Sequence, residues 1–188
     1  MSKVSKVIIG FTGKKSSGKS TAATHLCKEL GFVKHAFAEP IKVMIFHFIK
    51  SFGYSDVDAD QYIRFDKETV IPKIGVSARH CMQTLGTEWG RDCVHPDAWI
   101  LACKTELERS NAPLIVFDDV RFENEAALIR ELGGFIIHIE RGTWHPEDIH
   151  LSESGIFDQP GDVMIFNDDG LPDFETEVSA RVIWRLAH

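Results

Sequence analysis

The stretch with the clearest chemical meaning is a turn rich in glycine, serine and lysine at residues 13–20, GKKSSGKS. It fits the phosphate-loop (Walker A) pattern G-x-x-x-x-G-K-[ST] and lies between an apolar run and a helix-like segment. In such a turn, consecutive backbone N–H groups and the positive end of the helix dipole attract phosphate oxygens. Lys19 then reaches the β- and γ-phosphates, and the Ser20 hydroxyl is a ligand for Mg²⁺. The stretch therefore predicts binding of a nucleoside triphosphate.

Two adjacent carboxylates, Asp118 and Asp119, follow a second apolar run at residues 113–117. A phosphate-loop protein brings a strand-end carboxylate close to Mg²⁺ in this way. We expect one of the two, with Asp118 favoured, to hold the metal. The other would orient a loop or Arg121.

Cations that could clamp phosphate groups lie in or beside the predicted loops. Arginine suits this task because its planar guanidinium binds two phosphate oxygens at once. Any of the four arginines named below could instead form a surface salt bridge. Lys14 and Lys15 could either add positive potential to the loop or be solvated. The arginines are Arg79, Arg91, Arg121 and Arg141.

The elements that must position these residues alternate between strands and helices. This pattern predicts an α/β fold with a five-stranded, mostly parallel sheet and helices on both faces. Ligands then lie beyond the carboxyl ends of the strands, where Gly13, Asp118, Arg141 and Asn167 fall. We expect strands at 4–12, 32–37, 113–119, 135–139 and 163–167, and helices at 20–30, 41–52, 77–90, 96–109, 121–132 and 174–186.

Two stretches do not follow this alternation. Residues 54–75 are polar, rich in Asp and weakly patterned, as expected for an inserted substrate-binding segment. Residues 141–161 contain Gly, Pro and His and are predicted to form a loop or short lid.

Length and composition favour one domain spanning residues 1–188, because 188 residues with 44% hydrophobic content can bury one substantial core. No apolar run approaches the roughly 20 residues of a membrane span, and residues 1–6 lead into a strand rather than a signal peptide. We therefore expect a cytoplasmic protein that does not bind membranes. The four cysteines form no CxxC pair and are expected to be reduced core residues.

The net charge of −7 is unevenly distributed. Residues 142–180 contain ten Asp and Glu but no Lys or Arg, which leaves 21 basic and 18 acidic residues elsewhere. Such a balance, without a basic stripe, argues against nucleic-acid binding and favours small anions held by a few cations.

Signalling GTPases are disfavoured because the D-x-x-G and N-K-x-D motifs are missing. At this size the leading class is a small-molecule kinase, which needs an acceptor pocket and a lid that excludes water.

Three segments together resemble the bacteriophage deoxynucleoside monophosphate kinases. They read FAEPIK at 37–42, QTLGTEWGRD at 83–92 and DDVRFENE at 118–125, and the likeness runs from the phosphate loop to about Glu153. The resemblance implies a P-loop kinase fold similar to adenylate kinase. It also implies transfer of the γ-phosphoryl group of ATP to a dNMP, with ATP and Mg²⁺ as cofactors and ADP and a dNDP as products.

Site residues carried over by the resemblance fall into three groups. The ATP-phosphate site comprises Gly13, Lys15, Ser16, Ser17, Gly18, Lys19, Ser20 and Thr21. The acceptor segment, 38–92, contributes Phe37 at its border, Ala38, Lys42, Arg79, Gln83, Trp89 and Arg91. Arg121 would touch the transferring phosphoryl group, Arg141 begins the lid, and His150, Ser152 and Glu153 resemble a lid motif, with Glu153 a further candidate for the substrate.

One departure from the pattern of related kinases lies in the lid. Several lid arginines often contact ATP, whereas no arginine follows Arg141 until Arg181. The contribution of the lid to ATP binding would then rest on Arg141, assisted by His145 or His150.

Selectivity for deoxyribose would need an aromatic side chain such as Tyr54, Tyr62 or Trp89 at the position of the ribose 2′-OH. Aromatic residues in these segments also suit core packing.

Several alternatives stay open at this point. A dephospho-coenzyme A kinase shares the loop and fold, and a module that binds ATP without turnover fits the loop alone. A nucleic-acid 5′-end kinase is disfavoured by the acidic final third. The accepted bases are not determined by residue spacing. An oligomer is possible, with a homodimer favoured, and a viral origin would place the protein in the host cytoplasm.

Overall fold

A computed structural model describes residues 6–142, 156–168 and 170–187 of the chain. The chain divides into two compact units: unit 1 comprises residues 1–36 and 108–188, and unit 2 comprises residues 37–107. The expected acceptor segment, 38–92, falls within unit 2. Among the described residues, no helix combines the length and the apolar character that crossing a membrane requires.

Unit 1 is built on a parallel sheet with strand order β2-β3-β1-β4-β5. In the central strand, Ile9 lies beside Val116 of β3 and Phe135 of β4. All pairs are parallel, so the residues that follow the strands lie at one edge of the sheet, which confirms the predicted fold class. The strands are β1 (Val7–Thr12), β2 (Val33–His35), β3 (Leu114–Phe117), β4 (Phe135–Glu140) and β5 (Val163–Phe166).

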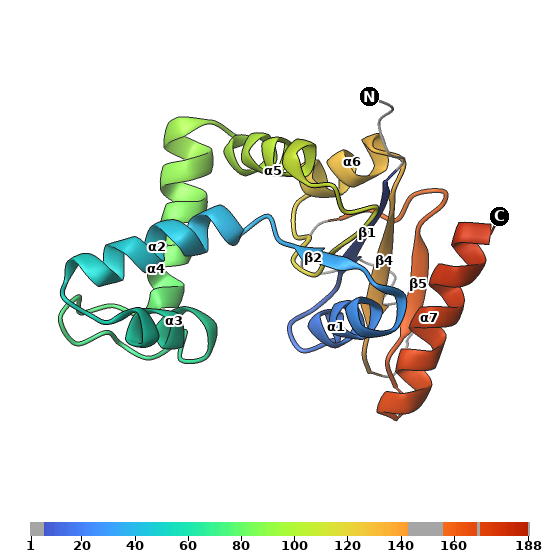
Figure 1. Ribbon diagram of the computed structural model, residues 1–188, viewed down its shortest axis with the longest axis horizontal. Helices are drawn as coiled ribbons and strands as arrows, with labels where there is room; N and C mark the ends of the chain where they lie inside the picture. Colours follow the sequence, from blue (N-terminus) through green and yellow to red (C-terminus); the bar gives the residue numbers. More distant parts are fainter. Residues whose placement is uncertain (1–5, 143–155, 169, 188) are drawn as a thin grey trace. The chain divides into compact units, whose positions relative to one another are not determined.

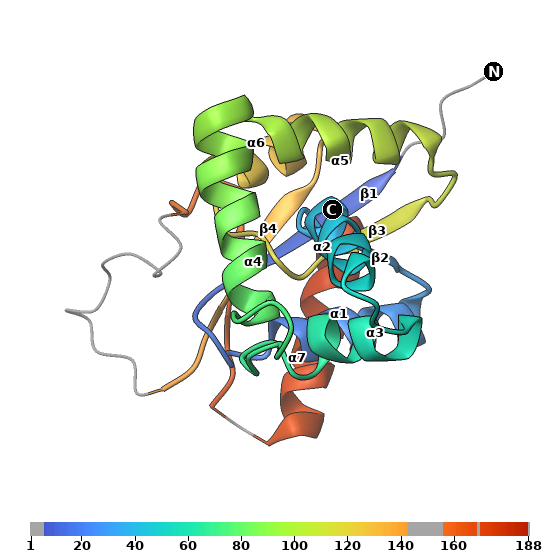
Figure 2. The same ribbon diagram turned by 90° about the vertical axis from the view of Figure 1, so that its left-hand side faces the viewer.

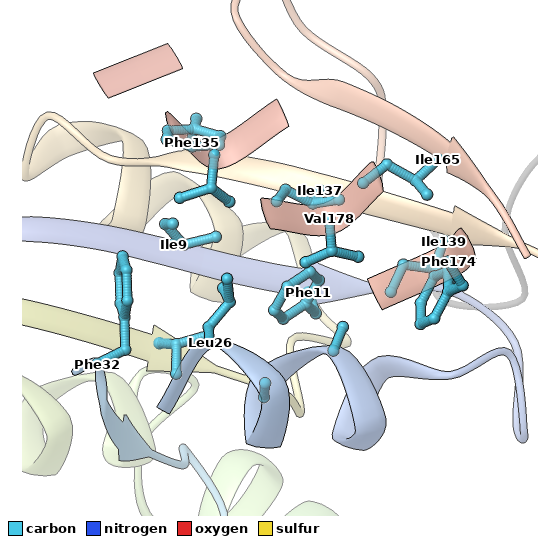
Figure 3. Packing of buried hydrophobic residues seen from close by; sticks show 14 residues of the cluster. Ile9, Phe11, Leu26, Phe32, Phe135, Ile137, Ile139, Ile165, Phe174 and Val178 are labelled. Atoms are coloured by element: carbon cyan, nitrogen blue, oxygen red, sulfur yellow. The ribbon is translucent and has the colours of Figure 1, made fainter. Parts of the chain in front are cut away.

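Helices cover both faces of this sheet. On one face, α1 (Lys19–Leu30) and α7 (Leu171–Ala187) pack Leu26, Phe174 and Val178 against Ile9 and Ile137 of the strands (Figure 3). The helix α6 (Glu123–Glu131) lies against the other face of the sheet (Figure 1). There a Cβ on Gly10 would lie 2.6 Å from the Ile129 side chain, so glycine lets α6 approach the sheet closely.

Unit 2 is helical and has its own apolar core. Buried side chains of α2 (Glu39–Ser51), α3 (Asp56–Arg64) and α4 (Ala78–Thr84) pack with Trp99 of α5 (Ala98–Arg109). Its central members are Ile41, Ile45, Ile49, Ile63, Ile71 and Trp99.

Residues 54–75, where the sequence pattern indicated no helix, contain α3. Its start carries a capping box: Ser55 Oγ accepts from the Asp58 N–H, and the Asp58 carboxylate accepts from the Ser55 N–H at 3.2 Å. This reciprocal pairing satisfies N–H groups that the first turn of a helix leaves without partners.

The helix predicted at 77–90 is present but changes character. After α4 it continues without a break as a π-helix, η1 (Leu85–Val94) (Figure 2). Trp99 Nε1 donates to the Gly86 carbonyl at 2.7 Å, and a Cβ on Gly90 would lie 2.4 Å from the Trp99 ring. Gly90 therefore makes room for a buried indole, whose N–H is bonded by the Gly86 carbonyl.

Candidate phosphate-binding site

The backbone of the phosphate loop requires glycine at two positions. Gly13 has φ 138° and Gly18 has φ 115°, which L side chains rarely adopt. A Cβ on Gly13 would lie 2.2 Å from the Ile139 carbonyl oxygen, and one on Gly18 would lie 2.5 Å from Asn167 Nδ2. The loop is thus seated directly against the carboxyl ends of β4 and β5.

Lys19 is folded back over the loop that precedes it. Its ammonium donates to the carbonyl oxygens of Gly13 at 2.7 Å and Lys14 at 2.6 Å. Burial lowers the pKa of Lys19, the positive charge of Arg121 lowers it further, and Asp118 opposes both. Lys19, Arg121 and Asp118 therefore share one electrostatic environment, and the ammonium keeps a third N–H for a ligand.

Side chains from the ends of β4 and β5 close the loop on the opposite side. Asn167 Nδ2 donates to the Ser17 carbonyl oxygen at 2.7 Å, and Arg141 Nη1 donates to that of Ser16 at 3.3 Å. Within the described part of the chain, the buried Ser17 hydroxyl has no hydrogen-bond partner. The contacts from Asn167 and Arg141 support the curved shape of the loop.

A hollow of about 310 Å³ lies over the loop and the start of α1. Its size suits a phosphate chain with part of a nucleoside. Seven of its residues are sequence-predicted, and Leu171 is an addition that no motif indicated. The lining residues are Ser16, Gly18, Lys19, Ser20, Thr21, Arg141, Asn167 and Leu171.

Asp118 lies just beyond β3 and is largely buried. Its carboxylate pairs with the ammonium of Lys34 at 2.5 Å, an interaction that the sequence did not indicate. Lys34 lies on β2 opposite Val116, one strand away, so only the β2–β3 register brings the two charges together. Asp119 follows directly and is half-buried.

A buried carboxylate holds the turn that carries Arg121. Glu125 Oε2 accepts from the backbone N–H of Arg121 at 2.7 Å and from that of Phe122 at 3.1 Å. Glu125 lies in the first turn of α6, where a negative charge also favours the helix dipole. The backbone at Arg121 is thus fixed, while its side chain is exposed.

The acceptor candidates form a separate group within unit 2. Lys42 pairs with Glu39 at 3.0 Å, and Arg79 pairs with Glu68. Phe37 is buried, Ala38 precedes α2, Gln83 lies on α4, and Trp89 and Arg91 lie on η1, where Arg91 Nη1 is 3.5 Å from the Pro96 carbonyl oxygen.

The structure describes the aromatic candidates for deoxyribose selectivity, but it does not describe most of the predicted lid residues. Tyr54 and Tyr62 pack edge to face in unit 2, with ring centroids 5.7 Å apart, so packing accounts for both rings. The predicted lid residues His145, His150, Ser152 and Glu153 lie outside the described residues.

Comparisons with known proteins identify a family and several relatives of this chain. A family model described as deoxynucleotide monophosphate kinase matches residues 50–178. A protein of Acanthamoeba polyphaga mimivirus whose name places it among deoxynucleotide monophosphate kinases is 30% identical over 188 residues, covering 92% of this chain and 94% of its own. The deoxynucleoside-5′-monophosphate kinase of Escherichia phage T5 is 33% identical over 75 residues, 40% of this chain and 30% of its own.

A solved structure shares the fold. The crystal structure of TT1252 from Thermus thermophilus aligns with a TM-score of 0.51 at 16% identity, covering 95% of this chain and 97% of that one.

Proposed function

The chain belongs to the deoxynucleotide monophosphate kinase family, and we propose that it transfers the γ-phosphoryl group of ATP to a deoxynucleoside monophosphate, giving ADP and a deoxynucleoside diphosphate. The single observation that carries the donor half is the hollow over residues 13–21, closed by Arg141 and Asn167. Family membership favours a nucleotide acceptor over dephospho-coenzyme A and over a module that binds ATP without turnover.

We assign the triphosphate of ATP to the phosphate loop. The loop N–H groups and the start of α1 would receive phosphate oxygens, and Lys19 would add an ammonium above them. Arg141 and Asn167 already bond the loop carbonyls from the other side, so they can support the loop while it carries a ligand.

The donor set beside the loop suits Mg²⁺. Ser20 offers a hydroxyl oxygen and Asp118 a carboxylate, and Mg²⁺ prefers such hard oxygen ligands. Because Lys34 engages Oδ2 of Asp118, we assign the other oxygen of that carboxylate to the metal, with Asp119 as the alternative ligand. When bound, Mg²⁺ would neutralise charge on the β- and γ-phosphates.

Catalysis by this chain would consist of positioning and charge neutralisation. The acceptor phosphate is already an anionic nucleophile, so no general base is needed. We propose that Lys19, Arg121 and Arg141 meet charge on the donor phosphates, and that Arg91 meets charge on the acceptor side. The carboxylate of Asp118 balances part of this positive potential.

We assign the acceptor nucleotide to unit 2. Lys42 and Arg79 are paired with Glu39 and Glu68 in the described structure, so an acceptor phosphate would have to replace a carboxylate partner. Arg91 lies on η1, with Nη1 3.5 Å from the Pro96 carbonyl oxygen, and we propose that its guanidinium binds the acceptor phosphate.

An acceptor screen tests the proposed reaction. ADP release and labelled product would be measured with all four dNMPs, the matching NMPs, dephospho-coenzyme A and a 5′-hydroxyl oligonucleotide. We expect turnover that depends on a dNMP and that a Lys19→Met variant largely loses. Turnover with dephospho-coenzyme A alone, or ADP release that no acceptor stimulates, would contradict the proposal.

A further inference from the structure

A lysine outside the phosphate-loop motif holds the carboxylate of Asp118. Lys34 lies on β2, which forms one edge of the sheet, and its side chain is 41% exposed. Its ammonium nitrogen is 2.5 Å from Asp118 Oδ2, and the Asp118 side chain is only 10% exposed. Ion pairs between two exposed groups contribute little, but a carboxylate that is mostly shielded from water depends strongly on its cation. Lys34 is therefore more than a solvated lysine on the surface.

The register of β2 and β3 places this ion pair on the α1 side of the sheet. Lys34 is paired with Val116 of β3, and Val116 belongs to the buried cluster that includes Leu26 of α1. Asp118 follows Val116 by two residues, the spacing at which side chains of an extended chain return to the same face. Burial raises the pKa of the Cys27 thiol on α1, Lys34 lowers it and Asp118 raises it further. Both charges therefore lie beside the helix that the phosphate loop opens.

Lys19 and Arg121 lie within electrostatic range of each other, and Lys19 also senses the charge of Asp118. Burial has the largest effect on Lys19 and lowers its pKa, Arg121 lowers it as well, and Asp118 raises it. We assign both cations to the donor phosphates, and a carboxylate that turned toward either would neutralise charge that a ligand needs. Such a turn would be favourable by itself, because hydrogen bonds between charged groups are strong. The bond from Lys34 to Oδ2 of Asp118 opposes it.

We propose that Lys34 is a positioning residue of the donor site. Its ammonium fixes the Asp118 carboxylate through Oδ2, so that this carboxylate forms no ion pair with Lys19 or Arg121 and its other oxygen is kept for Mg²⁺. Lys34 touches neither the substrate nor the metal and acts only through Asp118. The inference rests on the proposed function, in which Asp118 serves the metal.

Metal binding measured without any acceptor tests this role. Mn²⁺ would be the probe in place of Mg²⁺, and free Mn²⁺ would be measured by electron paramagnetic resonance in the presence of ADP. We expect Lys34→Met to bind Mn²⁺ about 10-fold or more weakly than the parent, as is typical when an outer partner of a metal ligand is lost. Lys34→Arg should restore most of this affinity, because a guanidinium can bond the same carboxylate oxygen. Lys28→Met, in the last turn of α1, is the control and should bind like the parent.

A double-mutant cycle separates an action through Asp118 from a general effect of the lysine. In the Asp118→Asn background, Lys34→Met should lower the Mn²⁺ affinity little further, because the group that Lys34 positions has already been altered. Urea denaturation of each variant shows that it is folded before binding is measured. A lysine on an edge strand can also act only by discouraging pairing with other chains, and that role would leave the two effects fully additive.

Three results would overturn the positioning role of Lys34. They are parental Mn²⁺ affinity in folded Lys34→Met, tighter binding in that variant, and full additivity with Asp118→Asn. A parent protein that binds no Mn²⁺ with ADP would overturn both this role and the proposed donor site. If the parent and its variants bind Mn²⁺ as expected but no dNMP is phosphorylated, the proposed reaction fails while the role of Lys34 stands.

Discussion

Single residues of the phosphate loop have separate tasks in the donor site. Gly13 and Gly18 allow the backbone to curve against β4 and β5, whereas Lys19 supplies charge above that backbone. A change at a glycine should therefore alter the shape of the loop, and a change at the lysine should alter its chemistry alone.

Replacing Lys19 should reduce turnover with little effect on folding. We expect Lys19→Met to lose on the order of 10²- to 10⁴-fold in kcat, because the ammonium meets charge that develops in the transition state. Lys28→Met, in the last turn of the same helix, is the matched control and should retain activity. Steady-state kinetics with a dNMP acceptor makes the measurement. A Lys19→Met enzyme with the parental kcat would exclude this role.

Replacing Gly13 should damage the loop itself. In Gly13→Ala the new methyl group would lie 2.2 Å from a backbone oxygen, so the loop must shift and ATP affinity should fall at least about tenfold through lost preorganisation. In Gly170→Ala the methyl group would lie 3.8 Å from Pro172 Cδ, an ordinary van der Waals contact, so this control should bind ATP normally. Calorimetric titration with a non-hydrolysable ATP analogue compares them; equal affinities would show that the loop tolerates the methyl group.

The residues that the sequence predicted for the donor site are those whose contacts are local or follow a strand end. Gly13, Lys19, Arg141 and Asn167 could be placed because each directly follows or lies near an apolar run that was recognisable as a strand. Lys34 could not, since its pairing with Asp118 depends on the register of two strands far apart in sequence.

Among the elements, α6 links structure and chemistry most directly. Its first turn contains Glu125, which bonds the backbone of Arg121, and its last turn contains Arg130, which bonds the segment before β5. A side chain in the first turn of α6 therefore fixes the backbone position of Arg121, a proposed catalytic residue.

Removing the Glu125 carboxylate should affect both stability and turnover. We expect Glu125→Ala to lose about 1–3 kcal/mol of unfolding free energy, because two N–H groups lose their acceptor, and to lower kcat through Arg121. Glu131→Ala, at the exposed end of α6, is the control. Urea denaturation and kinetics measure the two effects. In a double-mutant cycle, adding Arg121→Ala should then cost less than it does in the parent; full additivity of the kcat effects would argue against coupling.

Most elements could be predicted from hydrophobic pattern, and the exceptions have physical causes. The strands of unit 1 are buried on both faces and therefore appear as continuous apolar runs, such as residues 135–140. The helix α3 was missed because acidic residues obscure its apolar face, although Ser55 and Asp58 formed a recognisable capping box. Within the π-helix η1, Gly90 packs against Trp99 and the Gly86 carbonyl accepts from the indole N–H, and these contacts with a later helix are not encoded in any local pattern.

For the whole molecule, the division into two units separates the proposed donor and acceptor residues. The phosphate loop, Asp118 and Arg121 belong to unit 1, whereas Lys42, Arg79 and Arg91 belong to unit 2. Each unit has its own buried apolar cluster. Damage to the core of unit 2 should therefore affect acceptor use more than ATP binding.

A core substitution in unit 2 tests this separation. Ile49 is fully buried, and we expect Ile49→Ala to lose about 2–5 kcal/mol of unfolding free energy through the cavity it leaves. Val57→Ala, at a side chain that is 78% exposed, should change stability by less than about 0.5 kcal/mol. Denaturation followed by tryptophan fluorescence measures stability. Under native conditions, Ile49→Ala should raise the KM for the dNMP while the affinity for ATP stays parental; an equal loss of both would contradict the separation.

The route of the chain between β2 and β3 has a consequence for the speed of folding. These neighbouring parallel strands are joined through residues 36–113, which include the whole of unit 2. Closing so long a connection is entropically costly, and distant pairings form slowly. Unit 2 would have to collapse first, which shortens the effective connection, before β2 and β3 can pair readily. We therefore expect the ion pair between Lys34 and Asp118 to be among the last contacts of the donor site to form during refolding.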